Sequence, residues 1–260
     1  MKKLLFFPFI VLVSILTMAA LTTSYPIAKN QTFQIGEKLR YRVTYGVVDA
    51  GEAVLEVKST TKKPQGRDLI HVVATGRTLG GFNAVYKVED VYQSYIDRKG
   101  AFPWEFDRDV NEGGYIIKQN YIFNQHKQQV KTDKGNVNAP LGIQDMISSF
   151  YYARTLDFRN LKKGQILEFK CFMDGEIFPM KIKFVGKEDI TIRKGKFKCL
   201  KFLPVVQKGR YFKSEDDVNF WVTDDDNKIP IYVRAKIPVG TVKLHLVEWE
   251  GLTNPISKIK

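Results

Sequence analysis

The strongest constraint on the fold is an alternation of apolar and polar residues that runs from about residue 33 to the C-terminal region. Leu39, Tyr41 and Val43 fall on one face of an extended segment, and Arg40 and Arg42 fall on the other. Successive side chains of a β-strand point to opposite sides, so this period of two predicts strands with one buried and one wet face. Antiparallel sheets have such strands, whereas the strands of parallel sheets read as continuous apolar runs.

About fourteen segments share this pattern, and Gly, Pro, Asn and Asp lie between them, as hairpin turns require. The predicted strands are 39–45, 51–59, 68–75, 86–96, 104–110, 115–123, 128–132, 166–173, 178–185, 188–193, 197–205, 218–223, 229–237 and 241–249. Strands at this spacing predict one all-β antiparallel domain over 25–260, built as a curved sheet, an open barrel or a sandwich. Two smaller β units joined near 155–165 are the alternative.

One stretch breaks the alternation and predicts a short amphipathic helix. Its apolar residues recur three and four positions apart, which is the period of a helix with one buried stripe. They are Ile143, Met146, Ile147, Phe150 and Tyr151, with Pro140 and Gly142 at the expected start and Arg154 in the last turn. A single helix in a β-protein must bury that stripe, so we expect it to pack on a sheet face or to cover a barrel opening.

The N-terminal residues have the layout of a secretory signal peptide. Lys2 and Lys3 precede an apolar stretch from Leu4 to Ala20, and small residues follow. This order predicts a signal peptide over 1–24, with an uncleaved membrane anchor as the alternative. No later segment is apolar enough to span a membrane.

The chain carries 41 basic and 28 acidic residues. Such an excess favours anionic surfaces, for example lipid headgroups or glycans, although an ordinary basic surface explains it as well. Nucleic acid is not an expected partner of an exported protein. Lys194, Lys196 and Lys198 alternate along one strand and form the best candidate for a basic patch.

Two cysteines, Cys171 and Cys199, lie in strand-like segments. An exported protein meets an oxidising compartment, so the two can form a disulfide. A pair of buried free thiols is the alternative. Neither cysteine has a histidine near it in the sequence, so a catalytic cysteine is not expected.

Three consecutive aspartates, Asp224, Asp225 and Asp226, could hold a metal ion or form the tip of a hairpin. Alternating apolar residues flank them, and Asp favours turns because its side chain bonds the neighbouring backbone. The spacing also lacks the glycine and glutamate of a calcium loop. We therefore predict a turn, and we predict the same for Glu215, Asp216 and Asp217, which also separate two strands.

The sequence has no motif for catalysis, for a cofactor or for a metal. His71, His126 and His245 are far apart in the chain, and Ser148 and Ser149 lie in the predicted helix without a nucleophile motif around them. A phosphate-binding glycine loop is also missing. We therefore expect no catalytic residue, no metal ligand and no cofactor.

Aromatic residues make up 13% of the chain, and many of them fall on predicted strands. Most should fill the core, but a concave sheet lined with them would enclose an apolar cavity. The candidate lining residues are Trp104, Phe106, Tyr121, Phe123, Trp221 and Trp249.

Several stretches in order resemble the exported bacterial family known as domain of unknown function 3108. They include FQIGEKLRYRVTYGVVDAGEAVLEV (33–57), FPWEFDRDVNEGGY (102–115), DMISSFYYAR (145–154) and NFWVTDDDNKIPIYVRAKIPVGTVKLHL (219–246). The resemblance implies a β-rich protein of the periplasm, or of the periplasmic face of the envelope, in a Gram-negative bacterium. It supplies no catalytic residue.

Three functions follow as hypotheses. The first is a non-enzymatic envelope protein that binds a lipid-like or other apolar ligand in a β-barrel-like cavity, with the helix over one opening. The second is a scaffold module that engages an envelope protein or an anionic glycan through a basic sheet face. The third and least favoured is a hydrolase with scattered catalytic residues.

Overall fold

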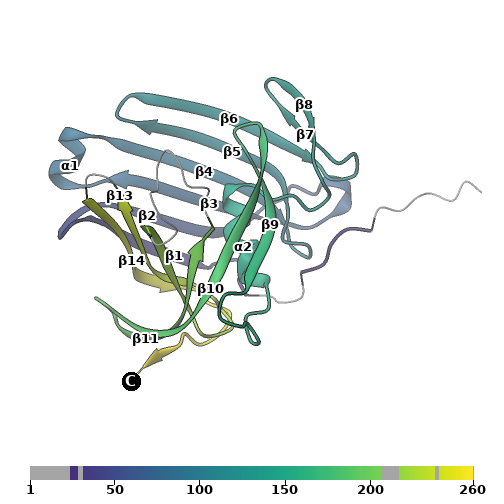
Figure 1. Cartoon of the computed structure of the whole chain (residues 1–260). Helices are drawn as coiled ribbons and strands as arrows, with labels where there is room; N and C mark the ends of the chain where they lie inside the picture. Colours follow the sequence, from purple (N-terminus) through teal and green to yellow (C-terminus); the bar gives the residue numbers. More distant parts are fainter. Residues whose placement is uncertain (1–23, 29–31, 206–216, 238–239, 260) are drawn as a thin grey trace, which may run out of the picture.

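The computed structural model describes residues 24–28, 32–205, 217–237 and 240–259, and more than half of them belong to one antiparallel sheet (Figure 1). The fold prediction of an all-β antiparallel protein is confirmed. The strands are β1 Lys38–Tyr45, β2 Val48–Ser59, β3 Leu69–Thr78, β4 Val88–Asp97, β5 Pro103–Glu112, β6 Tyr115–Asn124, β7 Gln129–Thr132, β8 Gly135–Asn138, β9 Ile166–Met173, β10 Glu176–Ile192, β11 Gly195–Pro204, β12 Val218–Thr223, β13 Pro230–Ile237, β14 Gly240–Glu250 and β15 Lys258–Ile259.

The chain builds this sheet as two meanders that meet at β1. Strands β1 to β8 pair in sequence order, β9 to β14 do the same, and β14 pairs with β1 over its whole length, from Lys38 opposite Glu250 to Tyr45 opposite Val242. Strands β8 and β9 are therefore the two ends of the curled sheet. The short strand β15 pairs with the start of β11.

Three strands differ from the sequence prediction for a local reason, and one of them, β15, has only two residues. The segments 178–185 and 188–193 form one long strand, β10, because a β-bulge between Phe184 and Gly186 absorbs the irregularity. Gly186 has a φ of +151°, which favours glycine. Strand β8 is only four residues long and was not predicted, since so short a segment shows no clear alternation.

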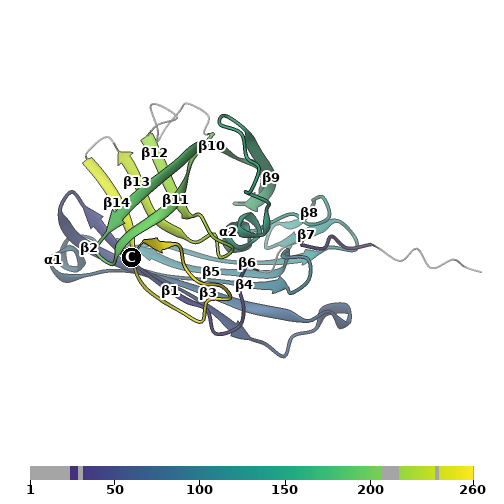
Figure 2. The same ribbon diagram turned by 90° about the horizontal axis from the view of Figure 1, so that it is seen from below.

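The curled sheet does not close through hydrogen-bonded strands, so of the three expected architectures the open barrel is the one found. Helix α2 (Met146–Thr155) and the segment before it lie in the gap between the two ends of the sheet (Figure 2). Gln144 forms a short parallel bridge to β9: its N–H donates to Lys170 O (3.0 Å) and its carbonyl accepts from Phe172 N (2.7 Å).

Side chains complete the closure that the backbone leaves open. Phe172 of β9 is fully buried and packs edge-on against Tyr121 and Phe123 of β6, with ring centroids 5.2 and 6.1 Å away. Arg108 of β5 forms an ion pair with Asp174, just past β9, at 2.6 Å. Aromatic packing and one ion pair thus hold β9 against β5 and β6, strands with which it shares no ladder.

The predicted helix is confirmed, but it begins three residues later than expected. Asp145 is its N-cap: the carboxylate accepts from Ile147 N (2.7 Å) and Ser148 N (2.6 Å), and the Ser148 hydroxyl accepts from Asp145 N. This reciprocal capping box satisfies amide groups that would otherwise be unpaired. Five residues of α2 are buried, and the other five, among them Met146 and Phe150, are partly exposed.

A second helix, α1 (Gly80–Val85), connects β3 to β4, and a single 3₁₀ turn lies at Pro64–Gly66. Neither was predicted, because both are too short to show a helical period. Among the described residues, neither α-helix is long and apolar enough to cross a bilayer.

The buried N-cap predicts an unusual pH dependence. Burial raises the pKa of Asp145 to about 6, from an ordinary value of 3.8. This carboxyl group therefore contributes stability that is fully present below 3.8 and is lost as the pH rises through 6, by about 3 kcal/mol. Asn at position 145 keeps the cap but does not titrate. Between about pH 4 and pH 7, the wild type should therefore lose about this amount of unfolding free energy relative to Asp145→Asn.

The unfolding free energies are measured by chemical denaturation at these pH values. Asp157→Asn is the matched control. Asp157 is exposed, and the hydrogen bonds and charge of Arg159 lower its pKa, so its pH effect should have the opposite sign. An unchanged difference for Asp145→Asn across this range would contradict the assignment of the raised pKa.

Candidate functional site

The inner side of the curled sheet encloses a partly open cavity of about 460 Å³. One wall is helix α2, and the others are β1, β2 and the strands from β9 to β14. The lining residues are almost all apolar: Tyr41, Ala53, Leu55, Met146, Ser149, Phe150, Ala153, Arg154, Phe158, Phe169, Met180, Ile182, Pro204, Val218, Phe220, Val222, Lys228, Pro230, Val233 and Leu244.

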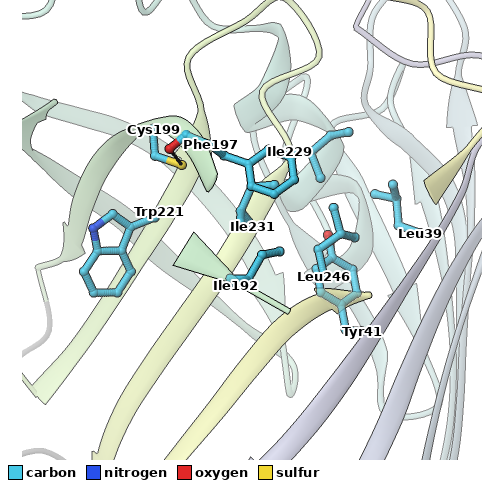
Figure 3. Packing of buried hydrophobic residues seen from close by; sticks show 9 residues of the cluster. All are labelled: Leu39, Tyr41, Ile192, Phe197, Cys199, Trp221, Ile229, Ile231 and Leu246. Atoms are coloured by element: carbon cyan, nitrogen blue, oxygen red, sulfur yellow. Dashed lines mark hydrogen bonds between the residues drawn. The ribbon is translucent and has the colours of Figure 1, made fainter. Parts of the chain in front are cut away.

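Strand alternation decides which residues of β12 face this cavity. Phe220 and Val222 point inward and line it, whereas Trp221, between them, lies on the other face. Trp221 stacks on Tyr232 with ring centroids 5.1 Å apart, and its Nε1 donates to Glu188 at 3.0 Å. It belongs to a packed cluster of nine buried residues (Figure 3).

Several large apolar side chains reach into the cavity without being covered. Phe150 of α2, Phe169 of β9, Phe220 of β12 and Leu244 of β14 all line it and are only half-buried. In the other half of the molecule, by contrast, α2 and the aromatic residues of β5 and β6 fill the interior. The structure is therefore packed on one side of α2 and hollow on the other.

Arg154 stands at the cavity wall, but its charge is fully compensated. Its guanidinium makes two hydrogen bonds to the Glu37 carboxylate (2.6 and 2.7 Å), and both side chains are buried. It also donates to the carbonyls of Thr32 and Asn227, each at 2.9 Å. Burial works to lower the pKa of Arg154, but Glu37 outweighs it and raises that pKa above its usual value.

Lys228 is a second cation at the cavity wall, and it has a different environment. Only 7% of the residue is exposed, and its ammonium donates one hydrogen bond, to the Leu156 carbonyl at the end of α2 (2.8 Å). It also lies 5.4 Å from the ring centre of Phe158. Among the described residues no carboxylate lies within ion-pair distance of it, and burial lowers its pKa.

Two hydroxyl groups near the cavity have no hydrogen-bond partner among the described residues. They belong to Tyr41 and Ser149, and both oxygen atoms are buried. Burial also raises the pKa of Tyr41, so its phenol stays protonated. Because neither oxygen is open to the cavity, both groups shape its wall and do not offer accessible donors.

The predicted cavity residues lie elsewhere in the structure, and none of the six lines this cavity. Phe106, Tyr121 and Phe123 form the core against Phe172, and Trp104 packs with Phe102 and Leu69. Trp249 packs edge-on against Phe197. Alternation places Phe220 and Val222 on one face of β12, but it does not reveal which face lines the cavity.

The two cysteines are free, so the disulfide alternative is not the one found. Strand β10 lies between their strands, and it pairs Phe178 with Cys171 and Glu188 with Cys199. These two positions are ten residues apart on β10, which is about 30 Å of strand, whereas a disulfide needs Cα atoms within about 7 Å. Burial raises the pKa of Cys171 to about 11 and of Cys199 to about 12, so both thiols stay protonated.

The three aspartates form a turn between β12 and β13, as predicted. Asp225 organises it, since its carboxylate accepts from the backbone N–H of Asn227 (2.8 Å), Lys228 (3.2 Å) and Ser257 (2.7 Å). Asp224 pairs with Lys187 at 2.7 Å. The turn gives Lys228 a φ of +51° and holds it beside the cavity. Glu215 and Asp216 lie outside the described residues, as does the predicted signal peptide apart from Ser24.

The histidines and the three alternating lysines occupy separate places. His71 stacks on Tyr95 and bonds to Gln93, His126 is exposed, and His245 lies against Tyr232. Lys194, Lys196 and Lys198 are exposed at the start of β11, and Lys196 pairs with Asp189. Within the described ranges, no group of three or more His, Cys, Asp or Glu residues is arranged to hold a metal ion.

The fold and the cavity define an open, β-barrel-like antiparallel protein with a hollow apolar interior. The chain belongs to the family described as "Protein of unknown function (DUF3108)", whose model matches residues 40–247. This finding confirms the resemblance seen in the sequence. No curated protein matches the chain.

Three solved structures match the chain at low sequence identity. A β-barrel-like protein of domain of unknown function DUF1849 from Brucella abortus is 11% identical, with a TM-score of 0.55 over 86% of this chain and 100% of that one. A DUF1089 family protein from Pseudomonas aeruginosa is 10% identical, with a TM-score of 0.38 over 69% and 87% of the two chains. The hypothetical protein CT021 from Chlamydia trachomatis is 9% identical, with a TM-score of 0.38 over 88% and 94%. The first of these supports the β-barrel-like fold and nothing beyond it.

Proposed function

We propose that the protein is a non-enzymatic binding protein of the bacterial envelope that holds a lipid-like ligand in the cavity beside α2. The observation that carries the proposal is the set of half-buried apolar side chains, including Phe150, Phe169 and Phe220, that face one partly open cavity. Leaving such surface uncovered forgoes roughly 25 cal/mol for each Å² that a ligand could bury. A cavity of about 460 Å³ is within the size range of small-molecule sites.

The N-terminal sequence supports the cellular setting. Lys2, Lys3 and the apolar stretch that follows them are typical of an export signal, so we place the protein in the periplasm or at the periplasmic face of the envelope. Lipids and other poorly soluble molecules of that compartment are therefore the class of ligand that the cavity would meet.

Mass spectrometry of the intact protein under native conditions is the first test. The protein should be purified gently from the periplasm of its own host, and the bound material should be extracted with solvent. We expect a stoichiometric apolar compound. Protein mass alone, in repeated preparations that have seen no detergent, would count against an endogenous ligand.

A cavity-filling variant gives an independent test. Ala153 of α2 faces the cavity, so Ala153→Phe should occupy part of it and weaken the binding of the neutral fluorophore N-phenyl-1-naphthylamine by about tenfold or more. Stability should change by no more than about 1 kcal/mol, since the new ring enters free space. The readout is the fluorophore's dissociation constant, with urea denaturation as the check on folding.

Ala84→Phe is the matched control, because Ala84 is a helical alanine in α1 that is exposed and far from the cavity lining. It should leave the dissociation constant unchanged. Equal binding by the two variants would mean that the fluorophore binds elsewhere and would remove the support for this cavity.

A basic surface is the second candidate function. Lys194 and Lys198 are exposed, and the described residues provide no carboxylate partner for either. They could engage an anionic glycan or an acidic envelope protein. Retention on a heparin column should then fall when both are changed to glutamate, and unchanged retention would reject this candidate.

A further inference from the structure

We propose that the cavity takes an anionic amphiphile, a molecule with a hydrocarbon chain and a single carboxylate or phosphate head, and that Lys228 holds the head. This inference rests on the proposed function and specifies the chemistry of its ligand. It derives from Lys228, the one charged side chain among the described lining residues that has no ion-pair partner.

The charge balance of the cavity wall gives the first argument. Among the described residues, its two cations are Arg154 and Lys228, and no acidic residue lines it. Glu37 neutralises Arg154 through two hydrogen bonds, and backbone carbonyls take further donors. The net charge that an occupant would meet is therefore the single positive charge of Lys228. A buried cation without a partner is costly, and an anion supplied by a ligand removes that cost.

The hydrogen-bond inventory gives the second argument. An ammonium group has three donors, and the described structure uses one of them, to the Leu156 carbonyl at 2.8 Å. Two donors remain in a residue that is 7% exposed, where water has little access. An anionic oxygen fits this vacancy better than a neutral hydroxyl, because charge-assisted hydrogen bonds are roughly twice as strong.

The neighbouring charges do not satisfy Lys228. Asp226 is exposed, and Asp157 already pairs with Arg159 at 2.7 Å. Both carboxylates favour the charged form of Lys228 from a distance, while Arg159 and Arg154 disfavour it, and burial is the largest effect and lowers its pKa. The turn residue Asp225 fixes the backbone of Lys228, so the position of this cation is set by the fold.

The geometry also orients the ligand. Lys228 and Phe158 stand together, with the ammonium 5.4 Å from the ring centre, while Met180, Pro204 and Val218 line the same cavity from β10, β11 and β12. A head at Lys228 therefore leaves the chain among apolar side chains only. An amphiphile with a positive head would place like charges together and should be excluded.

The test compares four ligands with the same chain and different heads: dodecanoate, dodecyl phosphate, dodecanol and dodecylammonium. The affinity of each ligand is measured by its displacement of N-phenyl-1-naphthylamine from the full mature chain. Each ligand is used below its own critical micelle concentration. In the wild type we expect both anions to bind about tenfold more tightly than dodecanol, and dodecylammonium to bind most weakly. The ratio of the two anions reports which head the site prefers.

The variants assign this preference to one side chain. Lys228→Met should remove the advantage of the anions over dodecanol, and Lys228→Arg should keep it. Lys187→Met is the matched control: Lys187 pairs with Asp224 of the same turn but is 69% exposed and does not line the cavity. It should behave like the wild type.

The outcomes separate this inference from the function on which it rests. Equal affinity for dodecanoate and dodecanol in the wild type would overturn the anionic head while leaving a lipid-binding cavity. A preference that survives in Lys228→Met would overturn the role of Lys228. Failure of every ligand, and of the fluorophore itself, would overturn the proposed function as well. The wild-type comparison decides the first point even if a variant does not fold.

Discussion

Replacing Arg154 with methionine is expected to lower the free energy of unfolding by about 3–5 kcal/mol. The reason is the environment of its partner: Glu37 is fully buried, and in the variant its carboxylate would have lost both of the hydrogen bonds that Arg154 supplies. The arginine also joins three distant segments, through Thr32, Glu37 and Asn227, so its loss should loosen the contact of α2 with β1 and the β12–β13 turn. Urea denaturation gives the free energy.

Arg159→Met is the matched control, since Arg159 also pairs with a carboxylate, that of Asp157, but is 77% exposed. Exposed pairs contribute about 1 kcal/mol or less, so this variant should be nearly as stable as the wild type. The double variant Arg154→Met with Glu37→Leu should recover part of the loss, because it leaves no charge unpaired. Equal losses of stability in the two single arginine variants would refute the interpretation that the buried Arg154–Glu37 pair stabilises the fold.

Replacing Phe172 with alanine is the second large expected effect, a loss of about 3–5 kcal/mol. Phe172 is fully buried and is the side chain through which β9 packs on Tyr121 and Phe123. No hydrogen-bonded ladder joins β9 to β6, so aromatic packing carries much of the closure. Hydrogen exchange should therefore accelerate in β7, β8 and β9 before it does in β1 or β2.

Phe169→Ala changes a side chain on the same strand, β9, that faces the cavity and not the packed core. Phe169 is only half-buried and lines the cavity, so its removal should cost less stability than the loss of Phe172 but should weaken apolar ligand binding. If both phenylalanine variants lost the same stability and the same binding, the division of the interior into a packed half and a hollow half would be wrong.

The strands could be predicted because their signal is local. Leu39, Tyr41 and Val43 alternate with arginines within one segment, and the aspartates at 224–226 lie between two such segments. The helix followed from a different local period, although its true start depends on the capping contacts of Asp145 with Ser148. These features need only neighbours in the chain, so the sequence suffices for them.

The site was harder to predict because it depends on contacts between residues that are distant in the sequence. The aromatic residues singled out from the sequence are large and lie on strands, but size does not reveal which side of a curled sheet they face. Trp221 points away from the cavity while Phe220 and Val222, beside it, line it. The cysteines show the same limit, because the strand that separates them becomes visible only with the pairing of β9, β10 and β11.

The sequence by itself determined the all-β antiparallel class, the helix at 146–155, the family and the turn at the aspartates, because each depends on periodicity or on motifs within a short stretch. The tertiary structure alone decided where the interior is hollow and which charges remain unpaired there. Arg154 pairs with Glu37 at a separation of 117 residues and is neutralised, whereas the Lys228 ammonium donates to the Leu156 carbonyl and has no carboxylate partner among the described residues. Such pairings depend on how the two meanders close around α2, and no local pattern encodes that geometry.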